Sequence, residues 1–305
     1  MDTQIISQTQ FDIDELIKKG SEYEKFENKN KHTWCSGCGD YGILSALKRA
    51  LVLENLSPQD TCLCYDVGCS GNGSDKINAY TIHGLHGRVT SLASGVSLAN
   101  SNLRVIASAG DGATFSEGIN HLIHSIRNNF DVTFICHNNS NYGLTIGQAS
   151  STTRIGQKMN ATIGEVVVEP LNTLQFVLSL NPSFVARSFS GDVEHMTKMI
   201  RAGMNHKGFS YIEIMQACPT FNKATPQQWY WDKLRYLDET NHNKNDIWEA
   251  RKLAEKVDEL GVGIIYQNSL KPEFSQTLSN RQNLKTTLVE EVMHYPILRL
   301  LEEFV

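Results

Sequence analysis

Two cysteines, Cys35 and Cys38, lie three residues apart in the glycine-rich stretch "HTWCSGCGDYG". A pair with this spacing can bind zinc, bind an iron–sulfur cluster, act as a redox dithiol or simply be buried. Five further cysteines follow in the chain: Cys62, Cys64, Cys69, Cys136 and Cys218. The chemistry of the pair therefore depends on which of these five join it in space.

A second pattern, "AGDGATFSEGINHLIHSIRNNFDVTFICHNN", places Asp111 between two glycines and ends in a double asparagine. Asp111 follows one predicted strand and Asn139, 28 positions later, follows the next, so one crossover brings both to the same sheet edge. Their oxygens suit Mg²⁺, and the glycines with the following helix N-terminus suit a diphosphate. Each motif alone is explained by a turn, but together they are typical of thiamine-diphosphate sites. A nicotinamide site is the competing interpretation, and no GxGxxG stands between a strand and a helix.

The elements that must position these residues alternate between helical and strand patterns. Helical apolar spacing predicts helices at 42–56, 88–100, 118–129, 171–180 and 193–203. Short apolar runs predict strands at 61–68, 103–112, 131–139, 183–189 and 209–218. Strands with interposed helices predict an α/β fold, with a mostly parallel sheet that carries helices on both faces.

Three regions are predicted along the chain. Residues 1–31 form a polar N-terminal extension, and residues 32–225 form the thiamine-diphosphate and iron–sulfur binding domain. Residues 226–305 hold three of the four tryptophans, a helical pattern at 249–260 and a short strand at 262–266. This last region is predicted to be a C-terminal extension that covers the core or meets a partner.

Composition narrows the function classes. The 305 residues carry 28 basic and 33 acidic side chains, a net charge of −5, which argues against nucleic acid or an anionic membrane as the main partner. No apolar run reaches the roughly 20 residues of a transmembrane helix. The N-terminal stretch lacks a signal-peptide pattern, so we expect a cytoplasmic protein whose cysteines are not paired in disulfides.

Position along the predicted strands separates the cysteines into two groups. Cys69 and Cys218 each follow a strand, so they are expected at the same sheet edge as Asp111 and near the Cys35–Cys38 loop. One close pair with two distant single cysteines is poor for a zinc ribbon but can serve a 4Fe–4S cluster. The cysteines inside strands are assigned to packing: Cys62, Cys64 and Cys136.

Several motifs in order resemble the beta subunit of the 2-oxoacid:ferredoxin oxidoreductases. They are "TWCSGCGDYGILSALKRAL", "GCSGN", "IHGLHGR", "GDG", "NNSNYGLTIGQAS", "VARSFSGD" and "HKGFSYIEIMQACPTFN". The resemblance covers most of the chain and continues weakly into "VGIIY". It implies the thiamine-diphosphate-binding fold, with thiamine diphosphate, Mg²⁺ and one 4Fe–4S cluster as cofactors.

The resemblance also implies roles for residues at matching positions. The cluster ligands would be Cys35, Cys38, Cys69 and Cys218. Mg²⁺ would be held by Asp111, Asn139 and the backbone carbonyl of Asn141. Thiamine diphosphate would contact Val67, Gly68, Cys69, Ser70, Gly112, Ala113, Gly143 and Leu144.

The activity implied by the resemblance is thiamine-dependent oxidative decarboxylation of a 2-oxoacid. Coenzyme A receives the acyl group, CO₂ leaves, and electrons pass through the cluster to ferredoxin. The family's activating glutamate comes from an alpha subunit, so this chain is expected to be half of an active site and inactive alone. The implied assembly is a heterodimer or a dimer of heterodimers.

The loop "HGLHGR" offers His83, His86 and Arg88 as substrate candidates. Arg88 or a histidine could bind the substrate carboxylate, while the alternative is a loop that bonds backbone groups and packs at the subunit interface.

The substrate itself is open between two branches of the family. The stretch "CSGNGSDKIN" has Asn72 where some relatives carry a lysine suited to a substrate carboxylate. The wording of "HGLHGR" and "YGLTIGQAS" favours 2-oxoglutarate over pyruvate. A zinc-stabilised, non-catalytic module is the rival outside enzymes, and a fused non-oxidative thiamine enzyme is the rival within them.

Overall fold

The computed structural model describes residues 19–257, 259–281, 283–284, 286–292 and 301–302, so most of the predicted N-terminal extension lies outside the described residues. The strands are β1 (Thr61–Tyr65), β2 (Tyr80–His83), β3 (Arg104–Gly110), β4 (Val132–Asn138), β5 (Phe184–Phe189), β6 (Phe209–Met215), β7 (Leu234–Tyr236) and β8 (Leu260–Gln267). The helices are α2 (Gly20–Glu24), α3 (Asp40–Leu53), α4 (Val89–Ala99), α5 (Ile119–Asn128), α6 (Thr173–Ser179), α7 (Val193–Asn205), α8 (Gln227–Trp231) and α9 (Ile247–Ala254).

The strands form one 8-stranded sheet in the order β2-β1-β3-β4-β6-β5-β8-β7. The strands from β2 to β5 in this order run parallel, and β8 joins β5 in the antiparallel direction. All seven residues of β4 are buried, which is what a central parallel strand covered on both faces requires. The predicted fold class is confirmed.

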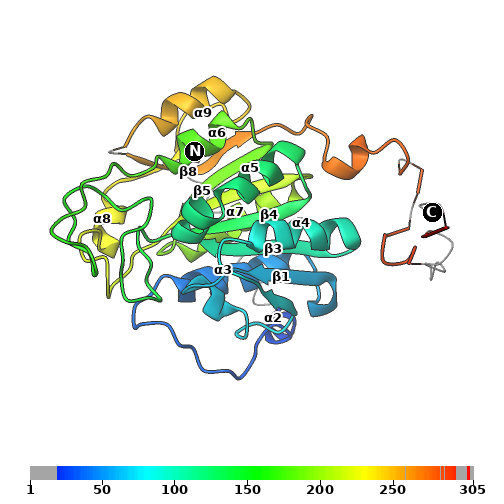
Figure 1. Ribbon diagram of the computed structural model, residues 1–305, viewed down its shortest axis with the longest axis horizontal. Coiled ribbons are helices and arrows are strands. Elements are labelled where there is room, and N and C mark those ends of the chain that lie inside the picture. The colour runs from blue at the N-terminus through cyan, green and yellow to red at the C-terminus, as the bar shows by residue number, and fades with distance from the viewer. Residues whose placement is uncertain (1–18, 258, 282, 285, 293–300, 303–305) are drawn as a thin grey trace.

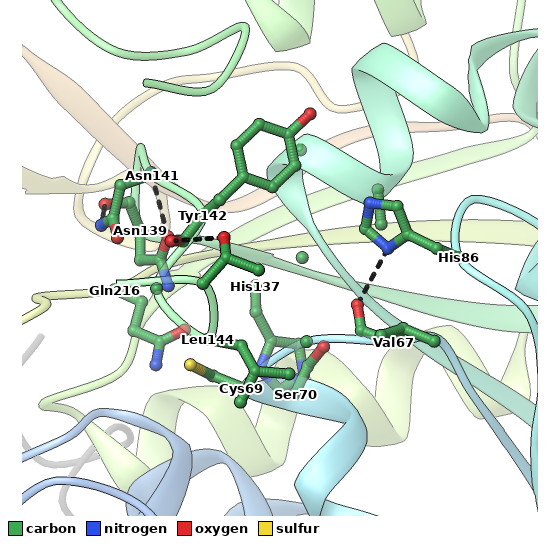
Figure 2. Close-up of a pocket in the computed structure, with 16 residues that line it drawn as sticks. Val67, Cys69, Ser70, His86, His137, Asn139, Asn141, Tyr142, Leu144 and Gln216 are labelled. Carbon is green, nitrogen blue, oxygen red and sulfur yellow. Dashed lines mark hydrogen bonds between the residues drawn. The ribbon is translucent and has the colours of Figure 1, made fainter. Parts of the chain in front are cut away.

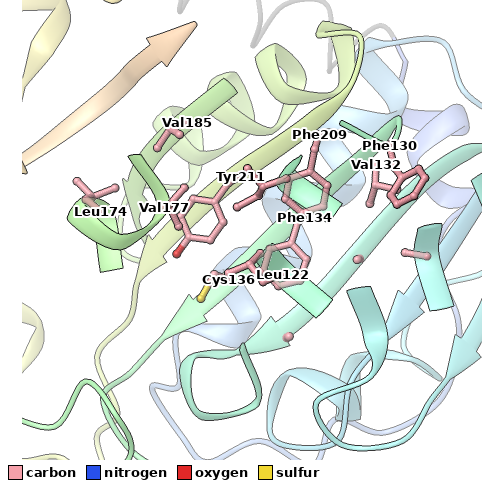
Figure 3. Close-up of a cluster of buried hydrophobic side chains, with 14 of the residues drawn as sticks. Leu122, Phe130, Val132, Phe134, Cys136, Leu174, Val177, Val185, Phe209 and Tyr211 are labelled. Atoms are coloured by element: carbon pink, nitrogen blue, oxygen red, sulfur yellow. The ribbon is translucent and has the colours of Figure 1, made fainter. Parts of the chain in front are cut away.

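Helices cover both faces of the sheet (Figure 1). On one face α4, α5, α6 and α9 enclose a core that includes Phe134, Phe209 and Tyr211 from the central strands (Figure 3). On the other face α3 and α7 pack over Ile106, Ile135 and Ile212. The two cores hold the strands in place, so the positions of the strand ends are set by the hydrophobic packing of both layers.

The C-terminal region adds strands that were not predicted as sheet members. The strand predicted at 262–266 extends to β8, and the three residues of β7 pair with it in parallel. The edge strand β2 was also missed, and only its last residue, His83, lies in the stretch interpreted as a loop. All four residues of β2 are exposed, so it lacks the apolar run by which a buried strand is recognised. No helix among the described residues is long and apolar enough to cross a membrane.

Leu122 on α5 offers a test of the packing that holds β4 in place. Its side chain is fully buried in the core under α5, so Leu122→Ala should lower the free energy of unfolding by about 2–5 kcal/mol. The matched control is Asn120→Ala on the exposed side of the same helix, which should change it by less than about 0.5 kcal/mol. Urea unfolding followed by circular dichroism measures both, and equal effects would contradict the assigned packing.

Candidate functional site

A cavity of about 290 Å³ opens at the carboxyl ends of β1, β3, β4 and β6. Figure 2 shows His86 and Val67 on one side of this cavity and Asn139 and Asn141 on the opposite side. All eight residues expected to contact the cofactor line it: Val67, Gly68, Cys69, Ser70, Gly112, Ala113, Gly143 and Leu144. Residues from four separate stretches of sequence therefore converge because the parallel strands end at one edge.

Asp111, which begins the turn after β3, is buried beside this cavity. One carboxylate oxygen, Oδ2, accepts hydrogen bonds from the hydroxyls of Ser150 and Thr152, both at 2.6 Å. The other oxygen, Oδ1, is buried without a hydrogen-bond partner in the described structure. Burial raises the pKa of Asp111 to about 6, although the hydroxyl hydrogen bonds act in the opposite direction. A buried carboxylate with one unpaired oxygen fits a divalent cation, which would supply the missing charge partner.

Asn139 and Asn141 form a tight turn directly after β4. The backbone N–H of Asn141 donates to Asn139 Oδ1 at 3.1 Å, and the side-chain amide of Asn141 donates to the Asn139 carbonyl at 2.9 Å. Both asparagines are buried and line the cavity. The turn therefore holds amide oxygens at the same edge as Asp111, as the spacing of the two motifs predicts.

Gly112 allows a close approach between the turn after β3 and Tyr142. A Cβ atom on Gly112 would lie 2.3 Å from the tyrosine ring, which no side chain can accommodate without displacing it. The glycine thus lets the Tyr142 ring close over the Asp111 turn, and its placement has a packing reason in addition to any contact with a cofactor.

The four cysteines assigned to the cluster also lie at this edge. Cys35 is exposed, whereas Cys38, Cys69 and Cys218 are half-buried. The loop that carries Cys35 and Cys38 meets the loop that carries Cys218. A Cβ atom built on Gly37 would lie 4.0 Å from a ring carbon of Pro219.

Two hydrogen bonds fix the loops that carry the cysteines. The indole N–H of Trp34 donates to the Cys69 carbonyl at 2.7 Å. The Gln216 side chain approaches the Cys38 sulfur at 3.6 Å. Each bond joins a loop that carries one cysteine to the loop of another, so the cysteine-bearing segments are braced against each other.

Burial and mutual repulsion disfavour free thiolates at this site. Burial raises the pKa of Cys69 to about 12, with further upward contributions from Asp40, Cys218 and Cys35. Burial also raises the pKa of Cys38 far above its usual range, and Asp40 and Cys69 add to the effect. Thiolates that repel one another in this way are stabilised by bound cationic iron or zinc.

No group of three or more His, Cys, Asp or Glu side chains in the described part of the chain is arranged to hold a single metal ion. The ligands of a 4Fe–4S cluster surround the cluster and do not converge on one ion. Cys62, Cys64 and Cys136 are buried in the sheet core, as predicted.

The three substrate candidates separate in the structure, because only His86 lines the cavity. Its ring lies between two carboxylates, 3.1 Å from Asp66 and 3.2 Å from Glu117. The Arg88 guanidinium donates to the carbonyls of Gly87 and Glu117, at 3.1 and 2.7 Å, so it ties backbone segments together.

His83 ends the edge strand β2, where its ring lies 3.3 Å from the Ser74 hydroxyl.

Sequence reasoning missed five residues that line the cavity, including two with side chains buried in the interior, His137 and Gln216. His137 Nδ1 lies 2.7 Å from Asp40 and Nε2 lies 2.9 Å from the Ser108 hydroxyl, all within the protein interior. Gln216 directly follows β6 and has a buried side-chain oxygen without a hydrogen-bond partner among the described residues. Both occur at strand ends, so the same edge argument that located Asn139 would have found them.

Comparisons with known proteins identify relatives that align with most of the chain. Residues 66–214 match a family model described as the C-terminal TPP-binding domain of thiamine pyrophosphate enzymes, and residues 218–283 match the C-terminal part of the pyruvate ferredoxin oxidoreductase beta subunit. The chain is 35% identical over 259 residues to 2-oxoacid:ferredoxin oxidoreductase 1, subunit beta, of Aeropyrum pernix, covering 81% of each chain. It is 29% identical to 2-oxoglutarate synthase subunit KorB of Methanocaldococcus jannaschii, covering 83% of this chain and 93% of that protein.

A solved structure shares the fold over most of the chain. It is the 2-oxoglutarate:ferredoxin oxidoreductase from Magnetococcus marinus with 2-oxoglutarate, coenzyme A and succinyl-CoA bound. The TM-score is 0.84 at 30% identity, and the match covers 92% of this chain and 95% of that chain.

The buried carboxyl of Asp111 predicts a pH-dependent stability in metal-free protein. The pKa of Asp111 is about 6 in the folded chain and 3.8 for an unperturbed aspartate. Between these pH values unfolding releases a proton, so the free energy of unfolding falls as pH rises. Wild type should therefore lose about 1 kcal/mol relative to Asp111→Asn between pH 5 and 7.5, measured by urea unfolding. The exposed Asp232→Asn change is the control and should follow wild type. A gap between wild type and Asp111→Asn that stays constant would contradict the burial effect.

Proposed function

Because this chain belongs to the beta-subunit family of the 2-oxoacid:ferredoxin oxidoreductases, we propose that it contributes the thiamine-diphosphate and cluster sites of such an enzyme. The observation that carries the proposal is the sheet edge itself. There Asp111 and Asn139 lie beside a cavity lined by the expected cofactor contacts, and the loops of four cysteines adjoin it.

The proposed reaction consumes a 2-oxoacid, coenzyme A and two oxidised ferredoxins. It yields an acyl-CoA, CO₂, one proton and two reduced ferredoxins, so the carbon–carboxylate bond breaks and a thioester bond forms. The two electrons released in forming the acyl group leave one at a time, because each ferredoxin accepts one.

We assign the Mg²⁺ site to Asp111, Asn139 and the carbonyl of Asn141, and the thiamine diphosphate site to the cavity. The unpaired Asp111 oxygen supports the first assignment and the unpaired Ser70 hydroxyl, on the cavity wall, supports the second. When bound, thiamine diphosphate supplies a carbanion that adds to the 2-oxo carbon and accepts the electron pair of decarboxylation. The chain's own residues position the diphosphate and exclude water around it.

We assign the 4Fe–4S ligands to Cys35, Cys38, Cys69 and Cys218. The hydrogen bonds that join the loops of these cysteines support this assignment, from Trp34 to the Cys69 carbonyl and from Gln216 to the Cys38 sulfur. The cluster, when bound, stores and releases single electrons. Cys69 also lines the cavity, so one residue would adjoin both cofactors.

The substrate is proposed to be 2-oxoglutarate, with pyruvate as the alternative. Support comes from relatives named for 2-oxoglutarate, including the KorB protein and the solved Magnetococcus marinus enzyme. Among the candidates in this chain, His86 is favoured to face the substrate because it lines the cavity, whereas Arg88 is committed to backbone carbonyls. The match to a pyruvate-enzyme model covers only residues 218–283.

The partners proposed for this chain are an alpha subunit, ferredoxin and coenzyme A. Relatives named "subunit beta" support the first, and residues 226–305 are proposed to take part in the subunit interface. We place the complex in the cytoplasm, where coenzyme A and ferredoxin are available.

Replacement of one proposed ligand tests the cluster assignment. In the complex purified anaerobically with its alpha subunit, Cys218→Ala should remove most of the brown colour and lower the iron content from about four atoms per heterodimer. Cys62→Ala removes a thiol that is buried in the sheet core, and should keep both. Iron analysis measures the outcome, and full iron in Cys218→Ala or equal loss in both variants would reject the assignment.

Substrate choice can be measured on the same complex. With coenzyme A and ferredoxin, kcat/KM for 2-oxoglutarate should exceed that for pyruvate by at least about tenfold, because a site that pairs with the second carboxylate discriminates against a substrate without it. The wild-type complex assayed without coenzyme A is the control for acyl transfer. Faster turnover of pyruvate would move the enzyme to the other branch.

A further inference from the structure

We call the four proposed cluster ligands, Cys35, Cys38, Cys69 and Cys218, the cysteine site. Its most solvent-exposed part is the loop that carries Cys35. Cys35 is exposed, while the other three proposed ligands are half-buried. An electron that leaves a cluster held by these residues therefore has its shortest way to solvent on the Cys35 side. This inference rests on the proposed function, and it concerns what docks at that side.

Two lysines stand on the Cys218 side of this loop. Lys158 and Lys223 are both exposed and line one hollow, which is also formed by the segment that follows Cys218. Asn222, beside Lys223, donates its backbone N–H to the Cys218 carbonyl. Neither lysine pairs with a carboxylate among the described residues, so both charges are open to a partner.

Two further cations gather at Trp229, near the same hollow. The Arg154 guanidinium lies 4.3 Å from the centre of one tryptophan ring, and the Lys233 ammonium lies 5.1 Å from it. The next residue, Tyr230, has its hydroxyl 3.2 Å from the Gln216 carbonyl oxygen, and the Gln216 amide approaches the Cys38 sulfur at 3.6 Å, so this segment lies close to the cysteine site. The indole face holds these long side chains at the surface instead of leaving them mobile.

Lys29 and Lys31 stand on the other side, in the segment that leads to Cys35. Both are exposed, and in the described part of the chain neither forms an ion pair. The next residue, His32, stacks on Trp34 with ring centres 5.2 Å apart, and Trp34 is bonded to the Cys69 carbonyl. The segment is thereby held against the cysteine site. Figure 1 shows this blue loop and the segments around α8 on the same side of the molecule.

We call these six cations the basic rim: Lys29, Lys31, Arg154, Lys158, Lys223 and Lys233. The rim stands out because the whole chain carries a net charge of −5. Three carboxylates beside it are engaged: Glu27 pairs with Lys48 at 3.0 Å, Asp75 pairs with Lys76 at 2.8 Å, and Asp40 is buried against His137. Glu165, which lies beside Gly156, and Asp232, the residue before Lys233, are exposed acidic residues of this surface.

We propose that the basic rim docks a small acidic electron carrier, of the ferredoxin type, with its redox centre facing Cys35. Each turnover needs two one-electron carriers, so the carrier must bind, accept an electron and leave quickly. Contacts between exposed charges suit that demand, because they accelerate encounter and are weakened by salt without holding the complex tightly.

The experiment uses the complete complex and three paired variants. Lys158→Gln with Lys223→Gln, and Lys29→Gln with Lys31→Gln, each remove two rim charges. The matched control, Arg127→Gln with Lys207→Gln, removes two exposed charges that precede β4 and β6, at the edge of the sheet opposite the cysteine site. Ferredoxin reduction is measured across a range of salt concentrations, together with reduction of a small uncharged electron acceptor that needs no docking surface.

Each rim pair should lower kcat/KM for ferredoxin about tenfold at low salt, mainly through KM, and flatten its salt dependence. The control pair and all rates with the small acceptor should stay at wild-type values. Rim pairs that behave like the control would overturn the docking surface. A parallel loss with the small acceptor would also overturn it, since the lysines would then act on the chemistry. A wild-type complex that reduces neither acceptor with any 2-oxoacid would instead overturn the proposed function.

Discussion

The parallel alignment of the four strands β1, β3, β4 and β6 is the constraint on which the site depends. Each strand is buried and is fixed in register by its neighbours, so their carboxyl ends reach one edge together. Turns that are distant in sequence then share one cavity, with Val67 after β1, Asp111 after β3 and Asn139 after β4. A shift of β4 by one residue would reverse which side chains face the two cores and would move the asparagine turn away from Asp111.

Burial disfavours the charged forms of the acidic groups at the site. Asp111 keeps one oxygen without a partner, and its pKa of about 6 records the price of holding a carboxylate in the protein interior. The thiols of Cys38 and Cys69 are disfavoured as thiolates for the same reason, aggravated by Asp40. A cation bound among these residues would displace their protons and would supply the charge partner that the protein interior lacks.

The sequence predicted the central sheet because the sheet follows from periodicity, and the strand ends indicated where the residues of the proposed site would meet. Each predicted strand up to β6 is present, and the cofactor contacts carried over from the resemblance line one cavity. What escaped prediction depends on contacts between distant residues. Exposed β2 lacks an apolar run, and the pairing of β7 with β8 is set by packing. Sequence could not separate His86 from Arg88 either, since only the fold turns the guanidinium toward the Glu117 carbonyl.

Exposure varies across the cysteine site in a way that separates its two tasks. Chemistry on a 2-oxoacid benefits from a dry, enclosed cavity, in which charges act strongly. Electron delivery to a second protein requires the opposite, an edge close to solvent. Cys69 lies on the cavity wall whereas Cys35 is exposed, so the set of cysteines spans from one environment to the other. The Trp34 indole, bonded to the Cys69 carbonyl, braces the exposed loop against the buried one and keeps the two ends at a fixed separation.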